Sequence, residues 1–272
     1  MRSLSRGGAN VPEIVLSHFS LSRHHPVDER IRLAAEHGFD GIGLWVGHYE
    51  QLEQQGVAPS QLHELLDAHG IRLREIEVIT DLGATDAARA RMDIAWRMAD
   101  AFGSRYVQVI GPAGDDLQAA ARSFGDLCDR AADHGLTVGL EFLPFNDIPT
   151  VHEARRIVET AARPNGGICV DVWHHERGAR DLDAIAALPG ELITGIQLND
   201  GTRRPEHPDY YTDCLANRRP MGAGEFDLDA FVDAVRGTGT TAGWSLEVPN
   251  SAGWADAPAH VAAIAAGLRR WM

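Results

Sequence analysis

The sequence of 272 residues predicts a single (β/α)8 TIM barrel, and three observations support that fold class. Eight short apolar runs alternate with eight helical stretches, which is the count of such a barrel. A motif of a helix end, a glycine and an apolar strand recurs at a period near the length of one β/α unit. Oxygen-bearing side chains end four of the later apolar runs, one in each unit.

The repeated motif lies in the first half of the chain. Its four copies read AEHGFDGIGLW, DAHGIRLREIEV, DAFGSRYVQVI and ADHGLTVGLEF, and their glycines Gly38, Gly70, Gly103 and Gly135 are spaced by 32, 33 and 32 residues. A glycine directly after a helix takes the left-handed cap conformation without strain from a Cβ atom. We therefore expect a helix to end and a strand to begin at each of these positions.

The predicted elements alternate along the whole chain. The expected strands are 13–17, 39–45, 71–78, 105–110, 137–142, 167–171, 193–198 and 243–247. The expected helices are 27–37, 59–69, 85–102, 115–134, 150–162, 181–187, 227–236 and 256–269. With no linker in this pattern, we expect residues 13–272 to form one barrel domain and residues 1–12 a flexible tail. The long segment 199–226 follows the seventh strand, and a loop of that length is usually functional.

The composition excludes several classes of function. A net charge of −14 opposes binding to nucleic acid or to a membrane surface, because both are negatively charged. All 25 basic residues are arginine, which excludes a lysine Schiff base, an internal aldimine with pyridoxal phosphate and a Walker-type lysine. The start of the chain lacks the apolar core of a signal peptide, and no apolar run reaches the roughly 18 residues of a membrane span.

The three cysteines, Cys128, Cys169 and Cys214, form no CxxC motif and no paired framework. We therefore expect a cytoplasmic protein with reduced thiols and a small-molecule partner. Whether it forms a homo-oligomer is left open.

Four strand-end residues are the candidate metal ligands. Glu141, Asp171, Gln197 and Glu247 end the runs TVGLE, GICVD, ITGIQ and WSLE. Residues at the carboxyl ends of barrel strands converge on one active-site face, so these four can meet at one ion. Three carboxylates and one amide oxygen suit Mg²⁺ or Mn²⁺ better than zinc, which prefers nitrogen and sulfur. We predict one divalent metal ion, Mn²⁺ or Mg²⁺, at this position.

Several stretches carry a family resemblance that extends over nearly the whole chain. The segments LEFLPF, CVDVWHHERG, IQLNDG, RRPMGAGEFDL and LEVPN resemble the xylose isomerase-like TIM-barrel superfamily, in its sugar phosphate isomerase/epimerase branch. That branch includes keto-sugar 3-epimerases, inosose dehydratase and 3-dehydroshikimate dehydratase. The resemblance implies that Glu141, Asp171, Gln197 and Glu247 hold one divalent ion.

Two further residues acquire roles from the resemblance. His174 completes a D-x-x-H pattern with Asp171, which implies contact with the substrate or the reacting oxygen. Arg218 begins R-x-x-M-G-x-G, similar to a family run whose arginine reaches a substrate oxygen, although Met221 replaces the usual proline. Many epimerases have histidine where this chain has Gln197, and a glutamine there is also similar to several dehydratases.

The amino-terminal half offers three candidate substrate contacts. His18, Trp45 and Glu77 lie at or near the ends of the first three strands, so their side chains can face the mouth of the barrel. Each has an ordinary structural alternative, and for Trp45 a place in the core is equally compatible with the pattern.

The function predicted from these features is a metal-dependent isomerase or epimerase of a keto-sugar or related polyhydroxy ketone. Glu141 and Glu247 would be the general base and acid, and α-proton abstraction would give a metal-bound enediolate. If a β-hydroxyl leaves first with His174 as its proton donor, the same chemistry gives dehydration. A dehydratase (lyase) of a cyclic hydroxyketone such as 3-dehydroshikimate or an inosose is therefore the alternative.

Two other classes of protein share the fold. Endonuclease IV has this barrel, but its site is a histidine-rich trinuclear zinc centre, and this chain has a histidine-poor ligand set and an acidic net charge. A metal-binding barrel without catalysis is the other alternative, and a turnover assay distinguishes it from the enzymes.

The segment 199–226 contains a group of arginines, which favours an anionic substrate. They are Arg203, Arg204, Arg218 and Arg219. The alternative is a solvated loop in which acidic residues balance them, namely Glu206, Asp209 and Asp213.

Overall fold

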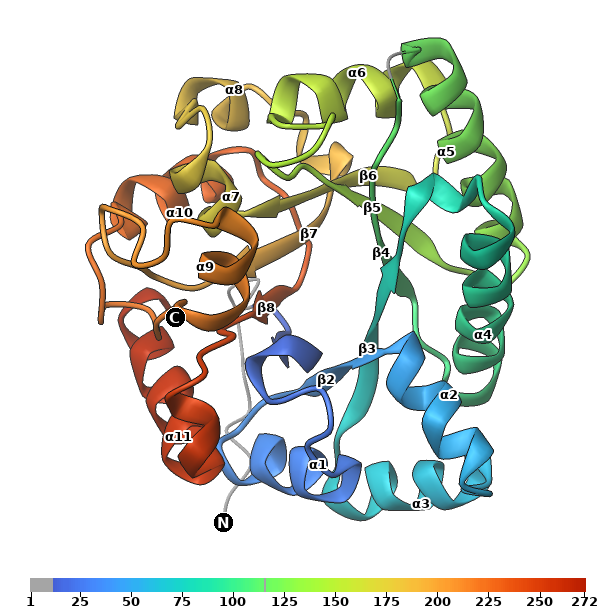
Figure 1. Ribbon diagram of the computed structural model, residues 1–272, viewed down its shortest axis with the longest axis vertical. Coiled ribbons are helices and arrows are strands. Elements are labelled where there is room, and N and C mark those ends of the chain that lie inside the picture. The colour runs from blue at the N-terminus through green and yellow to red at the C-terminus, as the bar shows by residue number, and fades with distance from the viewer. Residues whose placement is uncertain (1–11, 115) are drawn as a thin grey trace.

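The computed structural model describes residues 12–114 and 116–272, and it shows eight parallel strands closed into one barrel in sequential order (Figure 1). The predicted fold class is thereby confirmed. The strands are β1 (Ile14–Leu16), β2 (Gly41–Trp45), β3 (Arg72–Ile79), β4 (Tyr106–Ile110), β5 (Thr137–Glu141), β6 (Gly166–Asp171), β7 (Ile193–Leu198) and β8 (Trp244–Leu246). Apart from Pro12, the expected tail at 1–12 lies outside the described residues.

Helices surround the barrel on its outer side (Figure 1). Those that match the predicted stretches are α1 (Val27–Glu36), α3 (Pro59–His69), α4 (Asp86–Phe102), α5 (Leu117–Ala132), α6 (Val151–Ala161), α8 (Leu182–Ala186), α10 (Leu228–Gly237) and α11 (Ala257–Leu268). Three more were not expected: α2 (Val46–Gln54), α7 (Val172–Arg177) and α9 (Tyr210–Ala216). None of the helices in the described residues is both long and apolar enough to cross a membrane.

The repeated glycines end helices as the sequence pattern predicts. Gly70 and Gly103 cap α3 and α4 with φ of 66°, in the left-handed region where a side chain would be strained. Gly38 and Gly135 have φ of 81° and 66° in the turns after α1 and α5. These caps let each helix reverse into the next strand within a few residues, so the strand ends stay aligned.

The sheet packs against the helices through an apolar layer, while the barrel interior contains buried polar groups. Leu44, Ile76 and Val107 are at most 1% exposed and belong to the main core cluster. Inside the barrel, Glu75 accepts a hydrogen bond from Ser245 at 2.6 Å. Burial, with the nearby Glu77 adding to it, raises the pKa of Glu75 to about 8.

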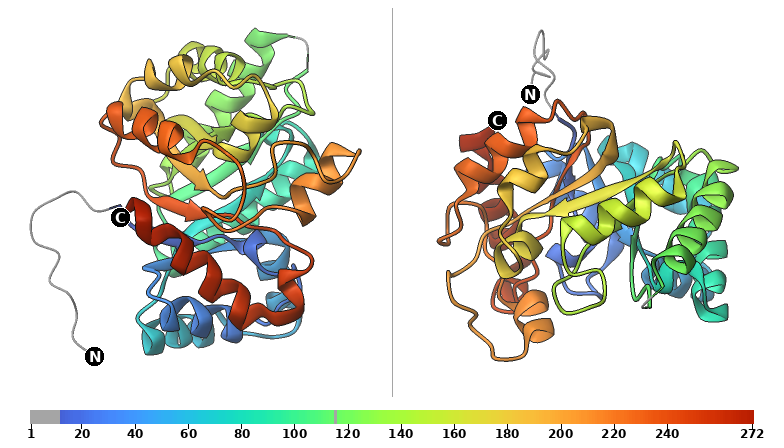
Figure 2. Two further views of the ribbon diagram at one scale, coloured as in Figure 1. Left: turned by 90° about the vertical axis from the view of Figure 1, so that its left-hand side faces the viewer. Right: turned by 90° about the horizontal axis from the view of Figure 1, so that it is seen from above.

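The segment after β7 is ordered around one buried aspartate. Asp200 accepts hydrogen bonds from the backbone N–H groups of Gly201, Gly222, Gly224 and Phe226, at 2.8 to 3.1 Å. Its own backbone pairs with that of Arg219 in an antiparallel bridge. Both views in Figure 2 show the orange part of this segment, with α9, standing out from the body of the barrel.

Candidate metal and substrate site

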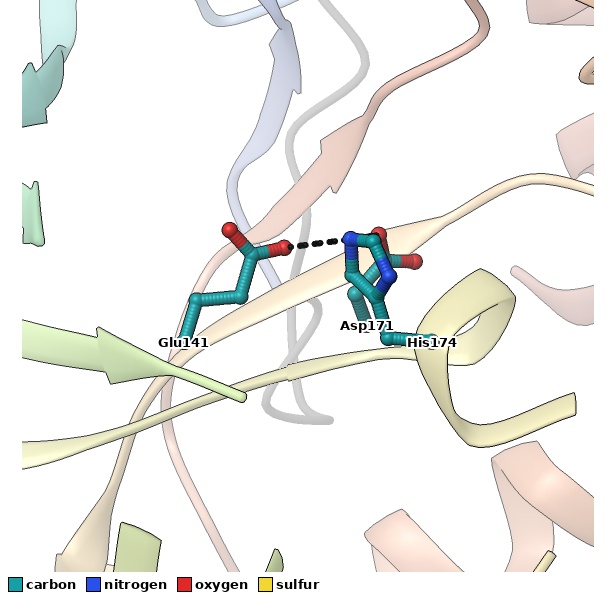
Figure 3. Close-up of side chains that lie close together, drawn as sticks. All are labelled: Glu141, Asp171 and His174. Atoms are coloured by element: carbon teal, nitrogen blue, oxygen red, sulfur yellow. Dashed lines mark ion pairs between the residues drawn. The ribbon is translucent and has the colours of Figure 1, made fainter. Parts of the chain in front are cut away.

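Glu141, Asp171 and His174 form a compact buried cluster at the carboxyl ends of β5 and β6 (Figure 3). One ligand atom from each residue lies within 4.8 Å of the others. His174 Nε2 is 3.2 Å from Glu141 Oε1 and 3.4 Å from Asp171 Oδ2. No other group of three His, Cys, Asp or Glu residues in the described part of the chain meets the same distance limit. The cluster has the donor types and the spacing of a divalent-metal site.

The local sequence explains how this cluster forms. Asp171 is both the last residue of β6 and the N-cap of α7, because its Oδ1 accepts the backbone N–H of Trp173 at 2.8 Å. The helix begins directly at the end of β6. His174 lies on its first turn and lines a pocket at the mouth of the barrel. Asn199 donates to the same Oδ1 at 3.0 Å, which leaves Oδ2 directed to the site.

Arg218 connects the carboxylates of β6 and β8. Its Nη1 donates to Asp171 Oδ2 and to Glu247 Oε2, both at 2.7 Å. Its Nη2 lies 3.4 Å from His174 Nε2 and donates to Cys214 Sγ at 3.0 Å. Burial raises the pKa of Glu247 well above its usual range, against the opposing effect of Arg218. A cation bound beside Glu247 would favour its ionised form.

Gln197 and the charge balance support the fit of a divalent ion. Gln197 pairs in register with Asp171 across β6 and β7, and its buried Oε1 has no hydrogen-bond partner among the described residues. A buried acceptor without a partner is costly unless a ligand satisfies it. When ionised, Glu141, Asp171 and Glu247 carry three negative charges and Arg218 carries one positive charge. The remaining two negative charges match one divalent cation.

The cluster lies in a pocket of about 270 Å³ at the carboxyl-terminal mouth of the barrel. Glu141, His174, Arg218 and Glu247 line it on the side of the later strands. The side of the first four strands contributes aromatic and polar residues, namely Phe19, Arg23, Trp45, Arg91 and Gln108. The volume suits one small ring or a short sugar.

The structure brings together most of the predicted site residues. The contacts described above join Glu141, Asp171, His174, Arg218 and Glu247. Glu141 lies beside the imidazole of His174, and Glu247 lies beside the guanidinium of Arg218.

The predicted substrate contacts from the first three strands divide into two groups. Trp45 lines the pocket. His18 and Glu77 are buried and do not belong to its lining. Glu77 accepts the backbone N–H of His18 at 2.9 Å and the hydroxyl of Ser17 at 3.0 Å, and its pKa is raised to about 7, chiefly by burial. Direct substrate contact by His18 and Glu77 stays a prediction.

The arginine group in segment 199–226 is dispersed in the structure. Arg218 is the member that lines the pocket, whereas Arg219 pairs with Glu206 at 2.9 Å near the surface. Asp213 is buried, and it accepts hydrogen bonds from the backbone N–H groups of Glu206 and His207 at 2.9 and 3.1 Å. The segment is therefore tied together internally by its acidic residues.

Several pocket residues were not found from the sequence, among them Gln108, Arg23 and Arg91. Gln108 donates to Glu141 Oε2 at 2.5 Å, and its only sequence signal is a polar residue within the apolar run YVQVI. Arg23 and Arg91 reach the pocket from a loop and from α4, where long exposed side chains follow no diagnostic pattern.

The fold and this strand-end site define a class of barrel proteins, and comparison with known proteins identifies the family. Residues 31–271 match the family model described as xylose isomerase-like TIM barrel, so the chain belongs to that family. Among curated proteins, the chain is 28% identical to a 3-dehydroshikimate dehydratase from Pseudomonas aeruginosa over 255 residues, which cover 89% of this chain and 38% of that protein. The chain thus spans well under half the length of this relative.

Two further similarities concern an isomerase and a solved structure. The chain is 28% identical to an inosose isomerase from Bacillus subtilis over 125 residues, which are 45% of this chain and 44% of that protein. A crystal structure of a protein called IOLI with a bound zinc atom has a TM-score of 0.83 and 18% identity, and covers 94% of this chain and 96% of that one. The named curated relatives are enzymes, and the likeness to the solved structure concerns the fold.

Proposed function

We propose that the protein is a divalent-metal-dependent dehydratase of a small cyclic hydroxyketone, which abstracts a proton α to the carbonyl and then releases a β-hydroxyl as water. The observation that supports this proposal best is the 3.2 Å contact between Glu141 Oε1 and His174 Nε2 inside the pocket. The two groups can act in sequence on neighbouring carbons of one ring. The similarity to 3-dehydroshikimate dehydratases over most of the chain agrees with this chemistry.

The ion would be held by Glu141, Asp171, Gln197 and Glu247. Once bound, it would act as a Lewis acid that polarises the substrate carbonyl. Mn²⁺ and Mg²⁺ suit the oxygen donors, while the adjacent imidazole of His174 also makes zinc compatible with the site. Reloading the metal-free protein with each of these ions therefore determines which metal supports activity.

The proton transfers can be assigned to the chain's own residues. Glu141 takes the α-proton, and protonated His174 gives a proton to the departing hydroxyl, which leaves as water. After the reaction Glu141 carries a proton and His174 lacks one, so transfer across their 3.2 Å contact restores both. Arg218, 3.4 Å from His174 Nε2, is positioned to hold an oxygen of the substrate in the same region.

Isomerisation or epimerisation is the second candidate. It requires an acid that returns the proton to the substrate, and Glu247, which follows β8, lines the pocket where such a group is needed. The similarity to an inosose isomerase agrees with this alternative. Both reactions begin with the same proton abstraction, so they share the α-exchange step.

The test combines metal reloading with two readouts. Protein stripped with a chelator is reloaded with Mn²⁺, Mg²⁺, Co²⁺ or Zn²⁺ and given carboxylated and neutral cyclic hydroxyketones in D₂O. Dehydration predicts α-deuterium incorporation and an ultraviolet-absorbing product, and Glu141→Gln abolishes both. Glu206→Gln, in the surface pair with Arg219, is the matched control and keeps activity. α-Exchange without loss of water would replace dehydration by isomerisation. Absence of both metal binding and exchange would refute the proposed function.

A further inference from the structure

The pocket has a basic side that the proposed proton transfers do not use. Arg23, in the loop after β1, and Arg91, on α4 after β3, are exposed and line the same pocket as Glu141 and Glu247. The acids come from the ends of β5 and β8, so the two arginines and the acidic cluster belong to different halves of the barrel.

Arg23 is held by aromatic residues. Its guanidinium lies 5.5 Å from the ring centre of Trp45 and 6.0 Å from that of Phe19. A cation–π contact attracts the positive charge without using an N–H donor in a hydrogen bond, so the N–H groups are available for an acceptor. The two rings thus hold Arg23 beside the pocket, and its N–H groups can still donate hydrogen bonds to a ligand.

Neither arginine is neutralised by a carboxylate. Within residues 12–114 and 116–272, Arg23 and Arg91 take part in no ion pair and no side-chain hydrogen bond. Arg89, two residues before Arg91 on the same helix, contrasts with them because it pairs with Asp86. Most other surface arginines of this acidic chain also have a carboxylate partner, so two unpaired arginines at one pocket are informative.

The charge of the pocket indicates what these arginines bind. An anionic substrate would be repelled by the net charge of −14 unless cations attract it at the mouth. A neutral polyol offers hydroxyl oxygens to an arginine but no charge for two cations to attract, so the pair favours an anion. We propose that Arg23 and Arg91 form a subsite for a carboxylate carried by the substrate on the part of its ring remote from the reacting ketone. This subsite rests on the proposed function, and it narrows the substrate class to cyclic hydroxyketones that carry a carboxylate.

A carboxylate is the anion that agrees with a small cyclic substrate. The guanidinium fork makes two-point contacts with carboxylates and with phosphates alike. A carboxylate is attached directly to a ring carbon, whereas a phosphate is attached through an ester oxygen and extends further from the ring. Inorganic phosphate is therefore included in the experiment as a competing probe.

The experiment compares Arg23→Met and Arg91→Met with Arg89→Met as the matched control on α4. The ratio of kcat/KM for a carboxylated cyclic hydroxyketone over a neutral inosose is measured for each protein. We expect each pocket variant to lower this ratio by about 10- to 100-fold, mainly through KM, because a charged hydrogen bond is lost. Arg89→Met keeps the ratio. Because all three side chains are exposed, melting temperatures should stay near that of the unmutated protein.

Binding of shikimate and of inorganic phosphate, measured by calorimetry, separates this proposal from the proposed function. Arginine-dependent binding of shikimate without turnover of any ketone would retain the subsite and refute the function. Turnover with an unchanged ratio in both variants would retain the function and overturn the subsite. Tighter arginine-dependent binding of phosphate than of shikimate would overturn the assignment to a carboxylate.

Discussion

The two carboxylate oxygens of Glu141 have different partners. Oε2 accepts a hydrogen bond from Gln108 at 2.5 Å, and Oε1 lies 3.2 Å from His174. An amide donor fixes one oxygen, so the other keeps a constant orientation toward the pocket. Variants of Gln108 and of His174 can therefore test the roles of the two Glu141 oxygens separately.

His174→Gln should separate the two halves of the proposed reaction. Glutamine cannot donate a proton as an acid, so loss of water should slow by about 10²-fold or more, while Glu141 still exchanges the α-proton with D₂O. Deuterium incorporation by NMR and product absorbance are followed in one sample. Equal loss of both signals would contradict a separate role for His174.

Gln108→Met should lower kcat by about 10-fold or more with a small change in melting temperature. The substitution removes the N–H donor to Glu141 but keeps a side chain of similar length in the wall of the pocket. Gln54→Met, the same substitution at an exposed residue of α2 outside the pocket, is the control. Steady-state kinetics with unchanged kcat would show that Glu141 needs no such support.

At the scale of elements, the segment 199–226 carries Arg218 to the acids, and Asp200 holds that segment in shape. Asp200→Ala removes a buried acceptor of four backbone N–H groups. We expect the free energy of unfolding to fall by about 2–3 kcal/mol and amide hydrogen exchange to rise around Gly222–Phe226. Unchanged exchange in that region would contradict the role. Asp209→Ala, which removes the N-cap of α9, is the comparison within the same segment.

The sequence predicted elements wherever the period of a strand or helix was complete. All eight strands and all eight predicted helical stretches appear within a few residues of their predicted bounds. The helix α7 was missed because it begins directly at the end of β6, and α9 was missed because it lies within the segment 199–226, which was expected to be a loop. α2 was missed because it follows β2 without a turn signal between them.

Site residues were predictable where backbone position determines them or where a motif marks them. Glu141 and Asp171 end buried strands, and a barrel brings strand ends together whatever the loops do. Arg23 and Arg91 depend on the paths of loops and on long side chains, which no periodicity encodes. The contact of Arg218 with two carboxylates is likewise a tertiary result, although its motif identified the residue.

At the scale of the whole molecule, the polar interior of the barrel makes stability depend on pH. The pKa of Glu75 rises from an ordinary 4.5 to about 8 in the folded protein, through burial and then Glu77. Between these values the folded state keeps a proton that the unfolded chain releases. Stability from this group is full below about 4.5 and is lost as the pH rises through about 8.

Glu75→Gln should therefore reduce the loss of stability toward alkaline pH. The melting temperature of the variant should fall less between pH 5 and pH 8 than that of the unmutated protein. Glu36→Gln, which removes a surface partner of Arg32, is the control and should leave the pH dependence unchanged. Identical pH profiles for Glu75→Gln and the unmutated protein would contradict the buried-carboxyl interpretation.

The register between β6 and β7 determines whether the proposed metal donors Asp171 and Gln197 face the same side of the sheet. Asp171 pairs with Gln197 across β6 and β7, and successive side chains of a strand point to opposite faces of the sheet. If β7 slipped by one residue, Gln197 would turn away from the pocket. A compact but misregistered barrel would thus lack a complete site rather than possess a weakened one. In a refolded preparation, the specific activity would then report the fraction of molecules whose sheet closed correctly.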